Sequence, residues 1–217
     1  MNRAVVLVVA KAPVAGRAKT RLGREVGMKR AADLAAAALL DTVQACAAAY
    51  GPERCHLSLD GVLEHGQLAD ELLDETAEWT FHVQRGEDFG ERLVNAHEDA
   101  ASASGSPVVQ VGMDTPHLSV QALREAGALL SAPDEAVLGP AYDGGWWLLG
   151  VGRPRLVAHL REVPMSTAET ATLTLEALTR AGARVTEIES LRDVDEVVDA
   201  ESVAAAAPHT RFARSWR

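Results

Sequence analysis

Short apolar runs rich in β-branched residues alternate along this chain with longer alanine-rich or amphipathic segments. The runs at residues 4–10 and 108–112 are almost continuously apolar, which is typical of strands covered on both faces. Further strands are predicted at residues 54–60, 79–83, 136–140 and 184–188. Helices are predicted at residues 28–50, 68–73, 120–130 and 166–180, before residue 103 and after residue 197. This alternation predicts an α/β fold: a single domain whose mostly parallel central sheet carries helices on both faces.

Capping residues and helix breakers mark several helix ends. Gly51 and Pro52 stop the alanine-rich helix at residues 28–50. Ser119 is placed to cap the helix at 120–130, and Ser166 with Glu169 has the spacing of a capping box that opens the helix ending at residue 180. That capping role would explain Ser166 without any catalysis. The domain is expected to span residues 1–207, followed by a loosely held basic tail at 208–217 that carries Arg211, Arg214 and Arg217.

Composition and charge narrow the class of protein. The 217 residues are 47% hydrophobic and 24% charged, which is ordinary for one globular domain of this length. A formal net charge of −10 argues against nucleic-acid or membrane partners, since both favour a basic surface. The apolar run at 4–10 is cut off by Lys11 and is short for a secretion signal, and the two cysteines form no disulfide framework. We therefore expect a cytoplasmic protein, with its oligomeric state, a homodimer included, left open.

A cation-rich loop follows the first predicted strand. It carries Lys11, Arg17, Lys19 and Arg21 around Gly16. Several cations and a glycine at this position supply what a di- or triphosphate needs: neutralising charge, bidentate donors and a closely approaching backbone. The spacing is neither that of a Walker loop nor that of a dinucleotide-binding fingerprint. A phosphate-binding loop is therefore predicted, with a solvated basic loop as the alternative.

Asp114 stands just past the end of the strand at 108–112. Ligands of open α/β sheets bind outside the carboxyl ends of the parallel strands, so a carboxylate there is placed to meet one. Asp114 is accordingly the first candidate for a metal ligand. The alternative is that Asp114, Thr115 and Pro116 only shape a turn before a helix.

The glycine-containing loop after residue 83 is a second candidate phosphate-binding segment. Gly86 and Gly90 would let the backbone approach a ligand, and Arg92 lies in the first turn of the following helix. A cation there opposes the helix dipole, a small cost that an anionic ligand could offset. A surface arginine is the alternative reading.

Residues 141–150 hold Asp143, Gly144 and Gly145 followed by Trp146 and a second tryptophan. Asp-Gly between apolar runs is typical of a plain hairpin turn. Two glycines beside an aromatic wall are also the make-up of a small-molecule pocket, which is the favoured interpretation.

Asp193 and Asp195 precede the last predicted helix. In isolation they are best explained as helix caps. A second carboxylate near Asp114 is, however, what a hard divalent cation bound with phosphates requires.

Taken in order, these motifs resemble one known family. They are Lys11-Ala-Pro-x-x-Gly-x-x-Lys-Thr-Arg-Leu, Gly86-x-x-x-Gly-x-Arg, Gly112-x-Asp-x-Pro, Gly139-Pro-Ala-x-Asp-Gly-Gly and Asp193-x-Asp. The set resembles GT-A-like bacterial transferases of the nucleotide-diphospho-sugar transferase superfamily, some of them arsenosugar-biosynthesis glycosyltransferases, over nearly the whole chain. The piece around Lys19 also resembles phospholactate guanylyltransferases.

The resemblance implies a role for each block. Lys11, Arg17, Lys19 and Arg21 would hold the phosphates of a nucleotide or nucleotide-sugar donor. Asp114 would bind Mg²⁺ or Mn²⁺, with Asp195 as a more distant second ligand. Asp143, Gly144 and Gly145 would line the side of the small-molecule acceptor, and Asp143 could orient or deprotonate its hydroxyl.

Two departures from the family pattern affect these roles. Many relatives continue the last block as Asp-Thr-Pro-Glu-Asp, whereas Glu-Val-Val-Asp follows Asp195 here. Many glycosyltransferases of this fold carry Asp-x-Asp, whereas Asp114-Thr-Pro offers one carboxylate.

Three functions therefore stay open. Whole-chain resemblance favours glycosyl transfer from a nucleotide sugar to a small acceptor. The lone Asp114 and the dense cations favour a nucleotidyltransferase that joins an NTP to a phosphorylated small molecule and releases pyrophosphate. The third is a nucleotide- or sugar-phosphate-binding protein without turnover.

Overall fold

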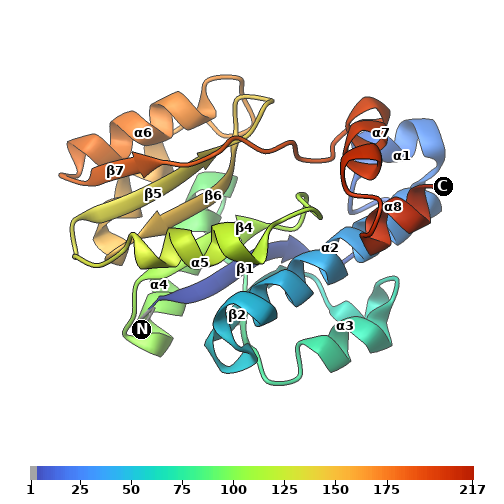
Figure 1. The fold of residues 1–217 in the computed structure, drawn as a ribbon, viewed down its shortest axis with the longest axis horizontal. Coiled ribbons are helices and arrows are strands. Elements are labelled where there is room, and N and C mark those ends of the chain that lie inside the picture. The colour runs from blue at the N-terminus through green and yellow to red at the C-terminus, as the bar shows by residue number, and fades with distance from the viewer. Residues whose placement is uncertain (1–3) are drawn as a thin grey trace.

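The fold is built on a central seven-stranded sheet, seen in a computed structural model that describes residues 4–217 (Figure 1). The strand order is β3-β2-β1-β4-β6-β5-β7, and only β6 runs antiparallel to its neighbours. The strands are β1 Val5–Lys11, β2 Cys55–Asp60, β3 Thr80–Val83, β4 Val108–Gly112, β5 Glu135–Pro140, β6 Trp146–Val151 and β7 Arg184–Glu187. The predicted mixed α/β domain with a mostly parallel sheet is confirmed.

The sheet changes its winding direction between β1 and β4. From β1 the chain moves outward through β2 to β3, then returns to place β4 on the other side of β1. Such a switch point leaves a crevice outside the carboxyl ends of the two strands, where ligands of open α/β sheets bind. The chain leaves β1 at Lys11 and β4 at Gly112, so both predicted motifs emerge at this crevice.

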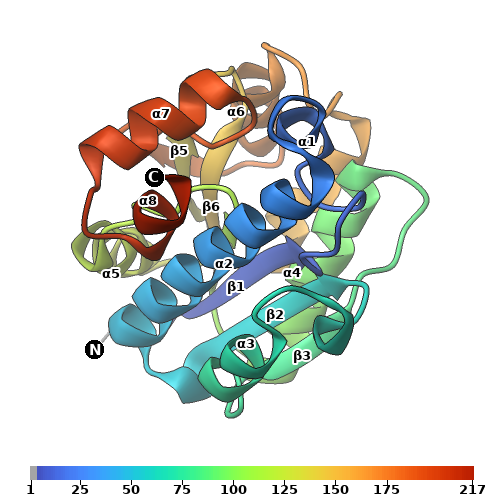
Figure 2. The same ribbon diagram turned by 90° about the vertical axis from the view of Figure 1, so that its right-hand side faces the viewer.

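Helices cover both faces of the sheet, as predicted. On one face α2 (Met28–Tyr50), α3 (Ala69–Glu75) and α5 (Val120–Ala128) share a core with β1 and β2, in which Leu39, Leu72 and Leu123 are fully buried. On the other face lie α4 (Phe89–Ser104), α6 (Thr170–Arg180) and the 3-10 helix η3 (Pro154–Glu162). Figure 2 shows α2 in front of β1 and α4 behind it.

Helix α2 is the longest helix and lies in the core. By length and composition it could cross a membrane, but 67% of its most apolar window is buried inside the protein. Its buried positions, among them Leu39, Leu40 and Val43, pack on the sheet. Burial in the core therefore accounts for its apolar character.

The last helices pack beside the first, so the terminal segment is not a loose tail. Helices α1 (Thr20–Val26), α7 (Val197–Ala206) and α8 (Arg211–Trp216) gather at one end of α2 (Figure 1). Phe212 is 1% exposed, and the backbone N–H groups of Arg211 and Phe212 donate to the Asp41 carboxylate at 2.9 and 2.8 Å. The sequence analysis did not predict this packing, because three arginines make the segment typical of an exposed basic tail although Phe212 belongs to the core.

Two capping predictions near the site were wrong, and one was right. Helix α6 begins at Thr170 without a side-chain cap, whereas Ser166 takes a positive φ of 61° in the loop before it. The box that caps α7 is made by Glu196 and Asp199, so Asp193 and Asp195 are not its caps. Ser119 does cap α5, since its Oγ accepts from the Ala122 N–H at 2.9 Å.

Candidate functional site

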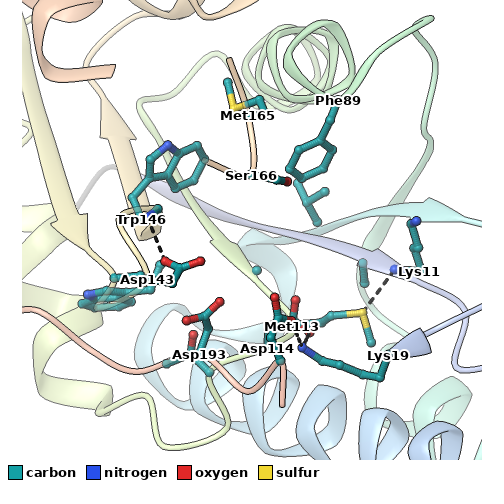
Figure 3. Close-up of a pocket in the computed structure, with 18 of the residues that line it drawn as sticks. Lys11, Lys19, Phe89, Met113, Asp114, Asp143, Trp146, Met165, Ser166 and Asp193 are labelled. Carbon is teal, nitrogen blue, oxygen red and sulfur yellow. Dashed lines mark hydrogen bonds and ion pairs between the residues drawn. The ribbon is translucent and has the colours of Figure 1, made fainter. Parts of the chain in front are cut away.

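A cavity of about 390 Å³ opens at the switch point. Its walls come from the ends of β1 and β4, the loop at residues 17–21, the start of β6 and the segment at residues 193–195. The cationic loop and Asp114 therefore meet in one cavity, as the sequence predicts. Figure 3 shows Lys19 and Asp114 facing each other across its floor.

Lys19 contacts three polar groups at the floor of the cavity. Its ammonium lies 2.8 Å from Oδ1 of Asp114 and 3.0 Å from Oδ1 of Asp195, and it also donates to the Val194 carbonyl. Burial opposes the charge of Lys19, whose side chain is 6% exposed, but Asp114 and Asp195 outweigh burial and raise its pKa. An ammonium has three N–H donors, so this one is fully used within the protein.

The backbone of Lys19 is in a strained conformation. Lys19 precedes α1 with a φ of 49° and a ψ of 45°, the left-handed region that costs a non-glycine residue about 1 kcal/mol or more. Its side chain gives α1 no cap and turns instead toward the carboxylates. The surrounding contacts of the ammonium hold the residue in this conformation.

Asp195 is engaged through both carboxylate oxygens. Oδ1 accepts from Lys19 at 3.0 Å, and Oδ2 accepts from Arg21 at 3.3 Å. Burial works against the charge of Asp195, but Lys19 and Arg21 outweigh it and lower the pKa. Asp195 is therefore an ionised carboxylate already paired with cations.

Asp193 is surrounded mainly by other carboxylates, whereas Asp195 is paired with cations. Its pKa is raised to about 6 by burial and then by the nearby negative charges of Asp143, Asp195 and Asp114, which Lys19 only partly offsets. Figure 3 places Asp193 between Asp143 and Asp114. The cavity floor thus holds an excess of negative charge that a bound cation would relieve.

The segment at residues 188–196, here called the strap, brings Asp193 and Asp195 to the floor of the cavity. It crosses the carboxyl ends of β5 and β4, where the N–H of Ile188 donates to Leu138, that of Leu191 to Pro140 and that of Val194 to Asp114, at 2.9, 3.1 and 2.9 Å. These backbone hydrogen bonds fix the positions of Asp193 and Asp195 relative to the carboxyl ends of the strands.

Lys11, Arg17 and Arg21 form the solvent-facing cationic side of the cavity. All three line it. The side chains of Arg17 and Arg21 are 67% and 62% exposed. Among residues 4–217, the Arg17 guanidinium has only a long ion pair of 3.9 Å with Asp60, and Arg21 pairs with Asp195 at 3.3 Å. Each guanidinium keeps further N–H groups for an anionic ligand.

Two glutamines that the sequence did not single out also line the cavity. Gln84 donates from Nε2 to the carbonyls of Ala10 and Ser58 at 2.9 and 3.0 Å. Gln110, on β4, is 2% exposed and its Oε1 has no partner among the described residues. No composition or spacing signal marks them, because the position of Gln110 depends on the register of β4 with β1, and that of Gln84 depends on where β3 ends beside β2.

The Asp143 segment combines the two interpretations that the sequence left open. It is a turn in which Asp143 Oδ1 accepts from the Gly145 N–H at 2.8 Å. Asp143, Gly145 and Trp146 also line the cavity. Because β6 runs antiparallel, Trp146 at its amino end lies at the same sheet edge as the carboxyl ends of β4 and β5.

Gly16 and Gly144 lie outside the described cavity lining. Gly16 has a φ of 78°, so it shapes the cationic loop rather than lining the cavity. Gly144 has a φ of 90° and packs against the Ala168 carbonyl so closely that a Cβ would clash. Its carbonyl accepts from the Ala171 N–H at 2.8 Å, which ties the turn to the start of α6.

Gly90 and Arg92 also lie outside that lining, which corrects their expected placement in the site. A Cβ on Gly90 would lie 2.7 Å from the Leu160 carbonyl oxygen, so this glycine serves the packing of α4 on η3. Arg92 pairs with Asp60 at 3.6 Å and donates to the Gly86 carbonyl at 3.2 Å. The anion that offsets the cost of a cation in this first helical turn is the carboxylate of Asp60.

Comparison with solved structures places this fold. Over 100% of this chain and 93% of the other, it superposes with a TM-score of 0.82 and 27% identity on a protein from Desulfovibrio desulfuricans G20 assigned as a nucleotide-diphospho-sugar transferase. A CMP:2-keto-3-deoxy-manno-octonic acid synthetase complexed with CTP matches with a TM-score of 0.55 and 14% identity, over 95% and 98% of the chains. A manganese complex of Rv0371C from Mycobacterium tuberculosis H37Rv matches with a TM-score of 0.51 and 17% identity, over 93% and 97%. No curated protein matches significantly.

The chain thus has the GT-A-like fold of the nucleotide-diphospho-sugar transferases and nucleotidyltransferases. Residues 42–167 match the family described as "uncharacterized protein conserved in bacteria" (DUF2064), and the chain belongs to that family. The matched range includes Asp114 and Asp143. It leaves out the cationic loop and the strap, so the fold rather than the family match joins these parts into one site.

Proposed function

We propose that this protein is a metal-dependent transferase that moves a glycosyl group from a nucleotide sugar to a small acceptor. The observation that carries the proposal is the convergence of a cationic loop and a group of carboxylates at the switch point, with Lys19 joining them at 2.8 Å. Its support is the 27% identical D. desulfuricans neighbour, whose fold covers the whole chain.

The phosphates of the donor would lie against Lys11, Arg17 and Arg21. These side chains line the cavity, whereas Lys19 is saturated by its own partners. We therefore assign Lys19 a positioning role: it holds Asp114 and Asp195 in place. The exposed arginines offer bidentate hydrogen bonds to phosphate oxygens, which lysine cannot provide.

The residues present fit a hard divalent cation, Mg²⁺ or Mn²⁺. The described residues form no group of three or more His, Cys, Asp or Glu side chains that could hold a metal alone. Mg²⁺ bound with phosphates, however, needs only one or two carboxylates. Asp114 and Asp193 would hold it, because both oxygens of Asp195 already accept from cations. When bound, the cation would stabilise negative charge on the departing phosphate.

Transfer would then depend mainly on positioning and electrostatics. The bond between the anomeric carbon and the phosphate oxygen breaks, the acceptor hydroxyl oxygen bonds to that carbon, and a nucleoside diphosphate leaves. Arg17 and Arg21 would compensate the charge of the leaving group. Asp143, beside Trp146 at the far side of the cavity, would orient the hydroxyl and take up its proton.

Nucleotidyl transfer is the second candidate. It is favoured by the density of cations in the loop at residues 11–21 and by the likeness of the fold to a synthetase complexed with CTP. In that reaction an acceptor phosphate would attack the α-phosphate of an NTP and release pyrophosphate. The two reactions give different products from the same site.

A ligand panel followed by a product assay tests the proposal. Thermal unfolding is measured with NTPs, NDPs and NDP-sugars, with and without Mg²⁺ or Mn²⁺. A ligand at about 100 Kd stabilises the protein by about 2.7 kcal/mol, which shifts the midpoint measurably. We expect an NDP-sugar and a metal to act together, and Asp114→Asn to abolish the metal-dependent part.

The products then separate the functions. NDP release in the presence of an acceptor supports glycosyl transfer. Pyrophosphate release would replace it with nucleotidyl transfer. Metal-dependent binding without either product would leave a nucleotide-binding protein without turnover.

A further inference from the structure

The charges of the cavity are divided between its two ends. Every lysine or arginine among the described lining residues comes from the loop at residues 11–21. The opposite end, around Asp143 and Trp146, is lined by no described lysine, arginine or histidine. Figure 3 shows Lys11 and Trp146 on opposite sides of the cavity, with Asp143 and Asp193 on the side of Trp146.

The cation-free end combines an apolar wall with hydrogen-bond acceptors. Trp146 and Met165 lie at this end (Figure 3), and Leu93 and Phe89 add further apolar lining to the cavity, Phe89 with 48% of its surface exposed. Trp146 and Met165 both pack against the cores on the α4 side of the sheet. An apolar wall of this kind suits the carbon face of a ring rather than a charged group.

Gln110, on the strand next to β6, provides a separate sign that a ligand belongs in this cavity. Its side chain is buried and lines the cavity, yet Oε1 has no hydrogen-bond partner among the described residues. A buried amide oxygen without a partner is uncommon, and a hydroxyl donor on a bound ligand would satisfy it. Ser166 lies on the same side of the cavity, near Met165 (Figure 3).

We infer that this end binds an uncharged, hydroxyl-rich ring and that Asp143 selects against phosphorylated ligands there. The inference rests on the proposed function and specifies the substrate class of the same site. Ionised carboxylates only accept hydrogen bonds, so their natural partners are hydroxyl groups. A phosphate placed beside Asp143 would meet a like charge and no neutralising side chain.

Two parts of a glycosyl-transfer reaction have this chemistry: the sugar of the donor and a neutral sugar or polyol acceptor. Both present hydroxyl groups and an apolar face. Binding of a neutral glycoside with a nucleoside diphosphate already in place would identify the acceptor. Displacement of that glycoside by the intact NDP-sugar would identify the donor sugar as the occupant.

Matched pairs of small probes test the inference on the full-length protein. Methyl glycosides of glucose, galactose, mannose and ribose are compared with the corresponding sugar 1-phosphates by saturation-transfer NMR. Mg²⁺ and the nucleoside diphosphate with the largest thermal shift are present throughout. We expect at least one neutral probe to bind at least roughly fivefold more tightly than its phosphate, as expected from a single like charge nearby.

A charge variant shows whether the Asp143 carboxylate causes this preference. Asp143→Asn removes one negative charge from the cation-free end and is expected to strengthen phosphate binding by roughly fivefold. The control is Asp70→Asn on the exposed side of α3, which changes the net charge equally and should leave both affinities unaltered. Trp146→Ala should abolish binding of the neutral probe, and Trp146→Phe, which keeps an aromatic face, should retain it.

Each outcome decides a different claim. Tighter binding of the sugar phosphates to the unmodified protein would overturn the inference. So would the absence of any neutral binding in a protein that binds the nucleotide. If no nucleotide binds under any condition, the proposed function itself fails, and the thermal-shift panel reports that failure independently of the sugar probes.

Discussion

The Nζ atom of Lys19 lies 2.8 Å from Oδ1 of Asp114, and this contact between a buried ammonium and a partly exposed carboxylate joins the loop after β1 to the segment after β4. Asp195 lies 3.0 Å from the same nitrogen, so one ammonium compensates two carboxylates. Removal of that ammonium leaves two negative charges with less compensation, which is costly when the groups are partly buried.

Lys19→Met should therefore destabilise the protein by about 2 kcal/mol at pH 7.5, somewhat below the figure for a fully buried pair because the carboxylates are partly exposed. Urea unfolding followed by circular dichroism measures the change. The matched control is Arg17→Met, because the Arg17 side chain is 67% exposed and its ion pair is 3.9 Å long. We expect less than about 0.5 kcal/mol there. Equal effects of the two substitutions would contradict the positioning role of Lys19.

Asp193 should make the metal-free protein less stable as the pH rises. Its pKa in the folded protein is about 6, raised by burial and neighbouring carboxylates above the ordinary value of 3.8. The folded state thus holds the proton more tightly than the unfolded state, so stability falls as the pH rises from about 4 to about 6. After a discount for solvent screening we expect about 1 to 2 kcal/mol.

Asp193→Asn should remove that component and be more stable than the unmodified protein at pH 7.5 in EDTA. Urea titrations at pH 4.5 and 7.5 give the comparison. An unchanged pH dependence in the variant would show that other groups cause it. With Mg²⁺ and nucleotide present the order should reverse, since the variant lacks a proposed metal ligand.

Gly144 should tolerate no side chain, because its φ is 90° and a Cβ would clash with the Ala168 carbonyl. Gly182 is the matched control: its φ is 83°, but no heavy atom lies within 4 Å of the position of a Cβ. Gly182→Ala should cost about 1 kcal/mol from backbone strain alone, and Gly144→Ala at least about 2 kcal/mol more. Thermal unfolding of both variants measures the difference. Similar values would mean that the loop moves aside and the turn is not fixed by this contact.

Phe212→Ala should destabilise the protein by about 3 kcal/mol, because Phe212 is 1% exposed and packs in the core formed by α1, α2 and α7. Arg217→Ala, at the exposed end of the chain, is the control and should change stability by less than about 0.5 kcal/mol. Urea unfolding distinguishes the packed helix from a loose basic tail, for which both substitutions would be nearly neutral.

The sequence was sufficient for six of the seven strands and for the two halves of the site, but it did not predict the antiparallel strand β6. Continuous apolar runs marked β1 and β4, and the rule that ligands bind beyond the carboxyl ends of such strands placed Lys11 and Asp114 together. These inferences hold because strand burial and strand polarity are local properties of the chain. The winding order that makes β1 and β4 neighbours is not local, and it became visible only in the sheet.

The details of the site depended on long-range contacts that the sequence does not display. Gly90 has the spacing of a phosphate-binding glycine, but the Leu160 carbonyl occupies the space beside it. Ser166 and Glu169 match a capping box, yet Ser166 takes a positive φ and the helix starts later. At both positions the local sequence pattern was compatible with two structures, and contacts with distant parts of the chain determined which one formed.

The strap at residues 188–196 has a consequence for how the protein is made. The Val194 N–H bonds to the Asp114 carbonyl at 2.9 Å, and the Val194 carbonyl accepts from Lys19. During synthesis Lys19 and Asp114 are made well before the strap, so the ammonium lacks two of its three acceptors until residues 194 and 195 are translated. A nascent chain that ends before the strap has a cationic loop and Asp114, but the floor of the cavity is completed only after translation of Asp195.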